Sequence, residues 1–125
     1  MKKILLVEDD SFLSSLLKNR LQKEGFEVVL AKDGDEAINY LRNINPDLLL
    51  LDLILPKKTG FEVMEELRSN PQLQGNSNLP IIVISNLGQQ EDIVKSRQLG
   101  AIEYYVKAKV SIDELVEKIK SFFAK

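Results

Sequence analysis

Five short apolar runs alternate with helical patterns along this chain, and that alternation limits the possible folds more than any other feature. The runs are continuous rather than alternating, as expected for strands that helices cover on both faces of a parallel sheet. Strands that alternate with helices are typical of βαβ units. We expect the strands at residues 4–7, 26–30, 48–51, 81–84 and 104–106.

The stretches between these runs carry the apolar spacing and the end signals of helices. A capping-box pattern from Ser111 to Glu114 opens the last of them, and Gly25 ends the first. Residues 70–78, rich in Asn, Gln and Ser, are typical of a long surface loop. The first helix has an apolar stripe of Phe12, Leu13, Leu16, Leu17 and Leu21. We expect helices over residues 11–24, 35–44, 60–69 and 90–99, and from 111 onward.

Length and charge narrow the functional classes. With 125 residues, we expect one domain over 1–125 that acts alone, because the chain is too short for a separate output domain. A formal net charge of -2 argues against direct binding of nucleic acid, which needs basic patches. The chain has no Cys and no apolar run as long as a membrane span, so we expect a cytoplasmic protein without a membrane partner.

The absence of His restricts the chemistry further. It removes the commonest general base, the commonest metal ligand and any histidine-based phosphoryl carrier. A reactive site must therefore be built from oxygen ligands and Lys.

Polar side chains follow four of the five expected strands. Residues 8–10, all acidic, follow the first strand, Asp52 the third, Ser85 the fourth and Lys107 the fifth. Ligands of open α/β sheets bind beyond the carboxyl ends of the strands, where the winding reverses. With the strand order 2-1-3-4-5, the first and third strands are neighbours, which brings Glu8, Asp9 and Asp52 together.

Three carboxylates in one pocket need a cation, because unit charges ~4 Å apart repel by about 4 kcal/mol at an effective dielectric near 20. Mg²⁺ suits a site made of oxygens, and it leaves coordination positions for phosphate oxygens. Asp52 is then the candidate nucleophile for an aspartyl-phosphate. The metal and Lys107 would neutralise the transferring group, and Ser85 would donate a hydrogen bond to it.

With these residues in place, the whole chain resembles a response-regulator receiver domain of two-component signalling. Residues 4–10 resemble the acidic loop after the family's first strand, and residues 48–56, with Gly60 at the expected place, resemble its phospho-acceptor motif. The resemblance implies a flavodoxin-like (βα)5 doubly wound parallel sheet with strand order 2-1-3-4-5.

The resemblance also assigns roles to residues of the site. Asp52 maps to the phospho-acceptor. The implied Mg²⁺ ligands are Glu8, Asp9, Asp52 and the backbone carbonyl of Ile54. By the same matching, Ser85 and Lys107 contact the phosphate, and Ser85 and Tyr104 form the switch.

The implied function is to accept a phosphoryl group from a partner histidine kinase or histidine phosphotransfer protein. Phosphorylation then remodels the surface of the fourth helix, fifth strand and fifth helix for a downstream protein that the sequence does not identify. Such a protein promotes its own phosphorylation and slow dephosphorylation and is not a metabolic enzyme. The alternative is a pseudo-receiver, an interaction module that works without phosphorylation.

Several residues have simpler interpretations. Asp10 is more readily interpreted as a helix cap than as a metal ligand, and Asp9 also has that alternative. Ser85 is also a common turn residue, and Tyr104 could be an ordinary core aromatic. A haloacid-dehalogenase-type phosphatase would need an acid at Ile54, and a flavodoxin would not place acids next to its phosphate.

Ala108 and Asn86 differ from the residues that the family usually has at these positions, and Ile54 and Leu87 are apolar next to the expected site. Ala108 replaces the usual Pro after the lysine, so a cis bond there would cost about 2.5–4 kcal/mol. Asn86 is larger than the usual residue after Ser85 and narrows the expected entrance. Ile54 and Leu87 are apolar where polar groups would orient an attacking water, which predicts a long-lived phosphorylated state.

Overall fold

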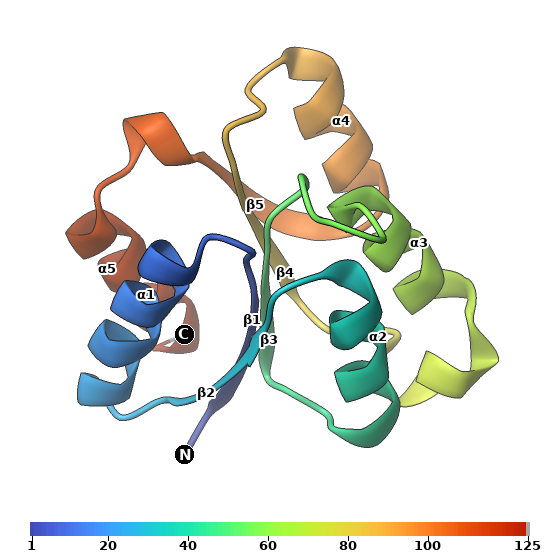
Figure 1. Ribbon diagram of the computed structural model, residues 1–125, viewed down its shortest axis with the longest axis horizontal. Coiled ribbons are helices and arrows are strands. Elements are labelled where there is room, and N and C mark those ends of the chain that lie inside the picture. The colour runs from blue at the N-terminus through green and yellow to red at the C-terminus, as the bar shows by residue number, and fades with distance from the viewer. Residues whose placement is uncertain (125) are drawn as a thin grey trace.

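The computed structural model describes residues 1–124 and contains one parallel sheet with five strands in the order β2-β1-β3-β4-β5 (Figure 1). The predicted flavodoxin-like topology and strand order are therefore confirmed. Among the described residues, no helix has the length and apolarity needed to cross a membrane. The strands are β1 Lys3–Val7, β2 Glu27–Ala31, β3 Leu48–Leu51, β4 Ile81–Ser85 and β5 Ala101–Val106.

Among the described residues, four of the five α-helices begin after a residue whose side chain caps the helix. Thr59 and Glu62 form a complete capping box at the third helix, and Ser111 and Glu114 form the predicted one at the last. The helices are α1 Ser11–Lys23, α2 Gly34–Asn43, α3 Gly60–Ser69, α4 Gln90–Gln98 and α5 Ile112–Phe123. Two 3-10 helices, η1 Pro71–Asn76 and η2 Lys107–Lys109, lie in the connections.

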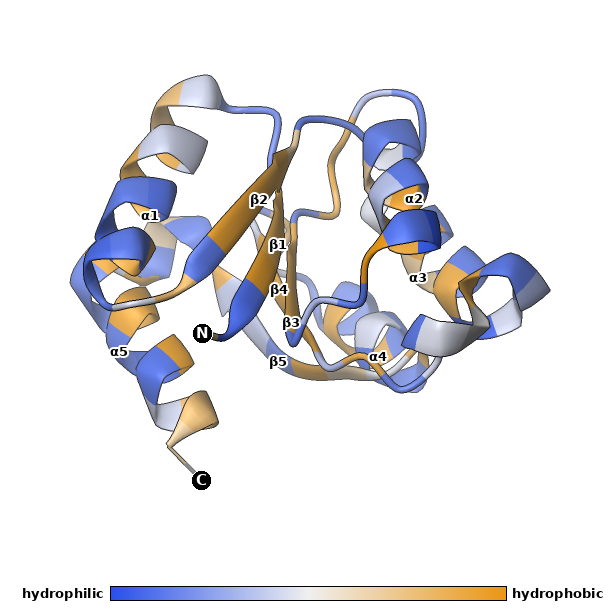
Figure 2. Ribbon diagram, turned by 90° about the horizontal axis from the view of Figure 1, so that it is seen from below, coloured by the Kyte–Doolittle hydropathy of each residue, from blue (hydrophilic) through white to orange (hydrophobic). Residues whose placement is uncertain are grey.

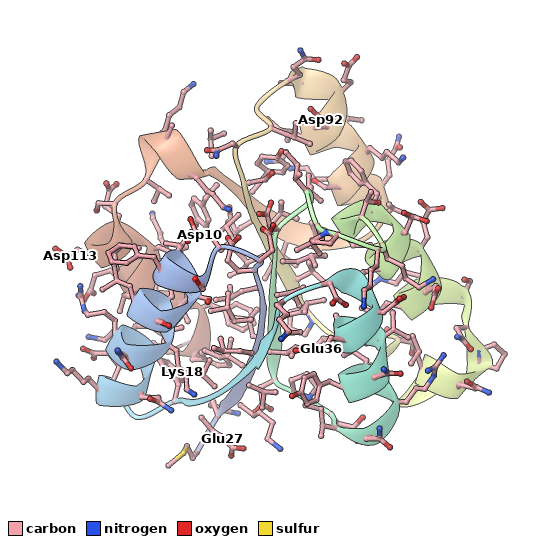
Figure 3. The ribbon with its side chains drawn as sticks, viewed as in Figure 1. Asp10, Lys18, Glu27, Glu36, Asp92 and Asp113 are labelled. Carbon is pink, nitrogen blue, oxygen red and sulfur yellow. The ribbon has the colours of Figure 1, made fainter. Side chains whose placement is uncertain are left out.

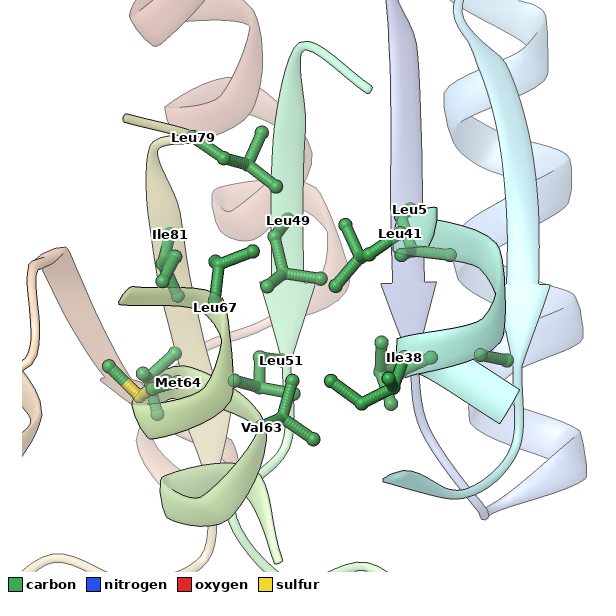
Figure 4. Packing of buried hydrophobic residues seen from close by; sticks show 14 of the residues in the cluster. Leu5, Ile38, Leu41, Leu49, Leu51, Val63, Met64, Leu67, Leu79 and Ile81 are labelled. Atoms are coloured by element: carbon green, nitrogen blue, oxygen red, sulfur yellow. The ribbon is translucent and has the colours of Figure 1, made fainter. Parts of the chain in front are cut away.

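Two helical layers cover the sheet, with α1 and α5 on one face and α2, α3 and α4 on the other (Figure 1). Because side chains alternate across a strand, the buried odd-numbered residues of β1 and β3 pack with Ile38 of α2 and Val63 of α3 (Figure 4). Their even-numbered neighbours pack with Leu17 of α1 and Ile119 of α5. The inner strands β1, β3 and β4 are apolar along almost their whole length (Figure 2), as burial on both faces requires.

The structure corrects the predicted stripe of α1. Phe12 is 77% exposed and Leu16 is 37% exposed, so both point away from the core. Leu17 and Leu21 are buried and Leu13 packs beside them. The buried face of α1 is narrower than the apolar pattern because α5 and the sheet contact only one side of the helix.

Two other predictions need correction. β5 begins at Ala101 instead of residue 104, since an edge strand can expose Ile102 and Glu103 and still pair with β4. Residues 70–78 are not simply a surface loop, because η1 buries Leu73 and Asn76 against the α2–α3 layer.

Candidate functional site

The pairing of β1 with β3 brings the acidic residues together. Val7 lies opposite Leu51 at the carboxyl ends of these neighbouring strands. The next residue of each chain segment is an acid, Glu8 after β1 and Asp52 after β3. The Asp52 amide donates to the Val7 carbonyl at 3.1 Å, so the hydrogen bonds between the two strands continue as far as Asp52.

Glu8, Asp9 and Asp52 form one acidic cluster. A carboxylate oxygen from each lies within 4.8 Å of the others. Glu8 and Asp52 are 2% and 3% exposed, while Asp9 faces solvent. Asp10 instead caps α1 by accepting from the amides of residues 12 and 13, as the simpler interpretation predicts (Figure 3).

Lys107 reaches into this cluster from the end of β5. Its Nζ lies 2.8 Å from Oδ2 of Asp52 and 2.6 Å from Oε1 of Glu8. Burial lowers the pKa of Lys107, but the hydrogen bonds and charges of Asp52 and Glu8 outweigh it and raise that pKa overall. The peptide bond to Ala108 is trans, and this geometry still places the ammonium in the cluster.

The electrostatics of the cluster favour one more cation. Burial raises the pKa of Glu8 to about 7, despite the opposing effect of Lys107. Oε1 of Glu8 is buried without a well-directed hydrogen bond from any described residue, although the Lys107 ammonium is close. One ammonium cannot balance three carboxylates, and their oxygens are the ligands that Mg²⁺ prefers. The residues present therefore fit a divalent cation held by Glu8, Asp9 and Asp52.

Ser85 and Tyr104 meet at the backbone of Leu87, in the loop between β4 and α4. The hydroxyl of Ser85, which is fully buried, accepts from the Leu87 amide at 3.3 Å. Tyr104 Oη donates to the Leu87 carbonyl at 2.5 Å. Burial raises the pKa of Tyr104, and the charges of Asp92 and Asp52 add to that rise, so the hydroxyl stays a donor.

Two more residues shape the loop after Asp52. The Ile54 amide donates to Oδ1 of Asp52 at 3.1 Å while its side chain is 54% exposed. The predicted role of the Ile54 carbonyl as a metal ligand stays a prediction. At Gly60, a Cβ atom would lie 2.4 Å from the Asp52 carbonyl oxygen, so only glycine allows α3 to begin this close.

Comparison with known proteins agrees with this geometry. The family model described as the response regulator receiver domain matches residues 4–120. The chain belongs to the receiver domain family. Relatives of this receiver domain include the transcriptional regulatory protein CpxR of Escherichia coli (strain K12), 41% identical over 121 residues that cover 97% of this chain and 49% of CpxR.

Solved structures give the same result for the fold. A CheY-like response regulator receiver domain protein from Methanospirillum hungatei JF-1 matches with a TM-score of 0.86 and 30% identity, over 98% of this chain and 93% of that one. The Mn²⁺-bound form of response regulator Rcp1 matches with a TM-score of 0.84 and 33% identity, over 98% and 94%. This receiver domain spans about half the length of the curated relatives it matches.

Proposed function

We propose that this receiver domain accepts a phosphoryl group on Asp52 from the phosphohistidine of a partner kinase or phosphotransfer protein. The observation that carries the proposal is the bridge of Lys107 Nζ between Asp52 and Glu8, within an acidic cluster that fits Mg²⁺. The matched family consists of signalling domains and not of metabolic enzymes, which supports a role in signal transfer. The proposal keeps the cytoplasmic location expected from the sequence.

The transfer exchanges the P–N bond of the donor for a P–O bond to Asp52 and needs one proton from solvent. A carboxylate oxygen of Asp52 attacks the phosphorus, the P–N bond to the donor imidazole breaks, and the leaving nitrogen keeps the electron pair and takes a proton from solvent. Lys107 lies 2.8 Å from Asp52, so its ammonium is placed to neutralise the phosphoryl oxygens. Mg²⁺ held by Glu8, Asp9 and Asp52 would supply further neutralisation of the same oxygens.

The switch is proposed to act through Leu87. The Ser85 hydroxyl now accepts from the Leu87 amide, and it would turn to donate to a phosphoryl oxygen. That movement leaves the Leu87 amide without its hydrogen-bond partner. The Leu87 carbonyl is then free to shift, which weakens its hydrogen bond from Tyr104. The loop before α4 then rearranges and changes the face of α4, β5 and α5 that a downstream protein binds.

Relatives support the proposal without settling its partners. CpxR is named a transcriptional regulatory protein, and this chain matches about half of it, so the output of this receiver domain is not fixed by the likeness. The Mn²⁺-bound state of Rcp1 supports a divalent cation site in a structure of the same fold.

Intact mass after incubation with acetyl phosphate tests the acceptor. We expect the wild type to gain one phosphoryl mass only when Mg²⁺ is present, and Asp52→Asn to gain none. Asp10→Asn is the matched control, since Asn also caps a helix, the Asp10 side chain caps α1, and the substitution keeps the Asp10 amide that donates to Glu8. Equal labelling of Asp52→Asn would move the acceptor elsewhere, and no labelling of the wild type would favour the pseudo-receiver.

A further inference from the structure

Arg68 lies near the C-terminal end of α3. Its side chain connects this helix to the segment before β4 and to the segment after α4. Among the described residues, its guanidinium donates to backbone carbonyl oxygens alone, those of Ser77 at 2.6 Å, Leu99 at 3.1 Å, Leu79 at 3.2 Å and Gly100 at 3.5 Å. The first and third of these lead into β4, and the other two follow the last turn of α4. One side chain therefore ties the end of α4 to α3 and to the start of β4.

Backbone carbonyl oxygens, and not a carboxylate, surround the positive charge of Arg68 among the described residues. Within residues 1–124 no carboxylate pairs with it, and burial lowers the pKa of its guanidinium. The carbonyls at the end of a helix lack intrahelical partners and carry partial negative charge, so a cation there is favourable. Gly100, with φ +102°, provides the space for the guanidinium, because a Cβ atom at this position would lie 2.4 Å from Nη2 of Arg68.

Asn76 extends this arrangement to α2. Its buried amide nitrogen donates to the carbonyls of Leu41 at 2.8 Å and Ile44 at 3.0 Å, at the C-terminal end of that helix. We call Arg68, Asn76 and the carbonyls that they bind the carbonyl clamp. It holds the ends of α2 and α4 that lie away from the acidic cluster.

The other end of α4 is held differently. Gln89, its N-cap residue, makes no side-chain capping bond, and Ser96 is the one buried residue of the helix. The loop before α4 is fixed through Leu87, whose amide and carbonyl bind Ser85 and Tyr104. Figure 3 shows Asp92, in the first turn, in the upper half of α4. The start of α4 therefore depends on residues of the switch, while its end depends on Arg68.

We propose that Arg68 is a positioning residue that fixes the C-terminal end of α4, so that phosphorylation moves this helix by a pivot about that end. The trigger rests on the proposed function, in which Ser85 leaves Leu87 when Asp52 is phosphorylated. The pivot itself rests on the carbonyl clamp, which shares no residue with the acidic cluster.

Hydrogen exchange followed by peptide mass spectrometry tests the pivot. The variants are Arg68→Gln, which removes the cation, and Arg68→Lys, which keeps the charge but cannot reach all four carbonyls. Arg97→Gln is the matched control, an exposed arginine in the last turn of α4. Each protein is measured at rest and after acetyl phosphate with Mg²⁺, and intact mass of the same sample gives the fraction phosphorylated.

At rest, we expect Arg68→Gln to speed exchange in the peptide over residues 97–101 by about tenfold, with Arg68→Lys between it and the wild type. Arg97→Gln should match the wild type. If Arg68→Gln left this peptide unchanged, or if Arg97→Gln had the same effect, the clamp would be wrong. If Arg68→Gln failed to fold, Arg68→Lys would test the clamp instead. Faster exchange than in the wild type over residues 97–101 would support the clamp, and an unchanged rate would contradict it.

After phosphorylation, the wild type should exchange faster over residues 87–93 and keep its rate over 97–101, whereas Arg68→Gln should change at both ends. Equal change at both ends of the wild-type helix would overturn the pivot. A sample without the phosphoryl mass would count against the proposed function, while the resting comparison would still decide the role of Arg68.

Discussion

Ile54 and Leu87 each stand two positions beyond a residue of the site, and both present hydrocarbon there. The Ile54 side chain is 54% exposed beside Asp52, and Leu87 packs partly against the core between the sheet and α3. Neither side chain can orient a water by hydrogen bonding. Hydrolysis of the acyl phosphate needs a water that attacks the phosphorus and releases the Asp52 carboxylate.

We therefore predict a slow loss of phosphate. A group that acts on an attacking water typically contributes ~10²–10⁴-fold, so Ile54→Asn/Leu87→Glu should lose the phosphoryl group faster than the wild type by a factor that approaches this range. Loss of phosphoryl mass with time measures the rate, and Ile54→Val is the control that keeps the side chain apolar. Equal rates in the wild type and the double variant would make the two residues packing or partner contacts.

Single residues differ in how well a sequence predicts them. Glu8, Asp52 and Lys107 could be located because a charged side chain is rarely buried at the end of an apolar strand unless it belongs to a site. The part played by Leu87 could not, since a backbone amide and carbonyl leave no trace in the side-chain pattern. The exposure of Phe12 is not predictable for a related reason, because the apolar spacing of a helix does not reveal how wide its covered face is.

At the scale of elements, the hydroxyls of Ser85 and Tyr104 both hold the loop between β4 and α4, and that of Tyr104 can be removed without changing the acidic cluster. Tyr104→Phe removes the bond to the Leu87 carbonyl and should cost about 1 kcal/mol of unfolding free energy. Hydrogen exchange in the loop should rise, while the phosphoryl mass gained with acetyl phosphate and Mg²⁺ should match that of the wild type. Tyr105→Phe is the matched control, a half-buried neighbour on the same strand without a described hydrogen bond.

Chemical denaturation of the two variants measures the difference. A Tyr104→Phe protein as stable as Tyr105→Phe, with unchanged exchange in the loop, would show that Ser85 alone fixes Leu87. The side chain of residue 104 would then serve packing, which is the simpler interpretation of a strand aromatic.

Elements were predicted best where local chemistry decides them. The capping box at Ser111 is a short-range pattern, and the structure contains it as predicted. The sequence predicts only a surface loop for residues 70–78, because the contacts that hold them come from distant residues. Asn76 donates to the carbonyls of Leu41 and Ile44, far away in the sequence. The first half of β5 was missed because an edge strand needs no continuous apolar run.

At the scale of the whole molecule, the fold concentrates negative charge where the neighbouring strands β1 and β3 end. Burial raises the pKa of Glu8 from 4.5 to about 7, so protonation of this group favours the folded state. Its contribution to stability is complete below about pH 4.5 and is lost as pH rises through about 7. The metal-free fold therefore carries an unfavourable charge at neutral pH, and a bound cation would offset it.

We accordingly predict that Mg²⁺ stabilises the protein, and does so more at roughly pH 8 than at roughly pH 6, because below the Glu8 pKa protons compete for the carboxylate. At ~100 times its dissociation constant, Mg²⁺ should add about 2.7 kcal/mol to the unfolding free energy. Denaturation with Mg²⁺ or with a chelator at each pH measures this. Glu8→Gln should lose most of the pH dependence and Asp9→Asn most of the Mg²⁺ effect, while Asp10→Asn, outside the cluster, should keep both. A stabilisation that is equal at the two pH values, or that survives in Asp9→Asn, would place the cation elsewhere on the surface.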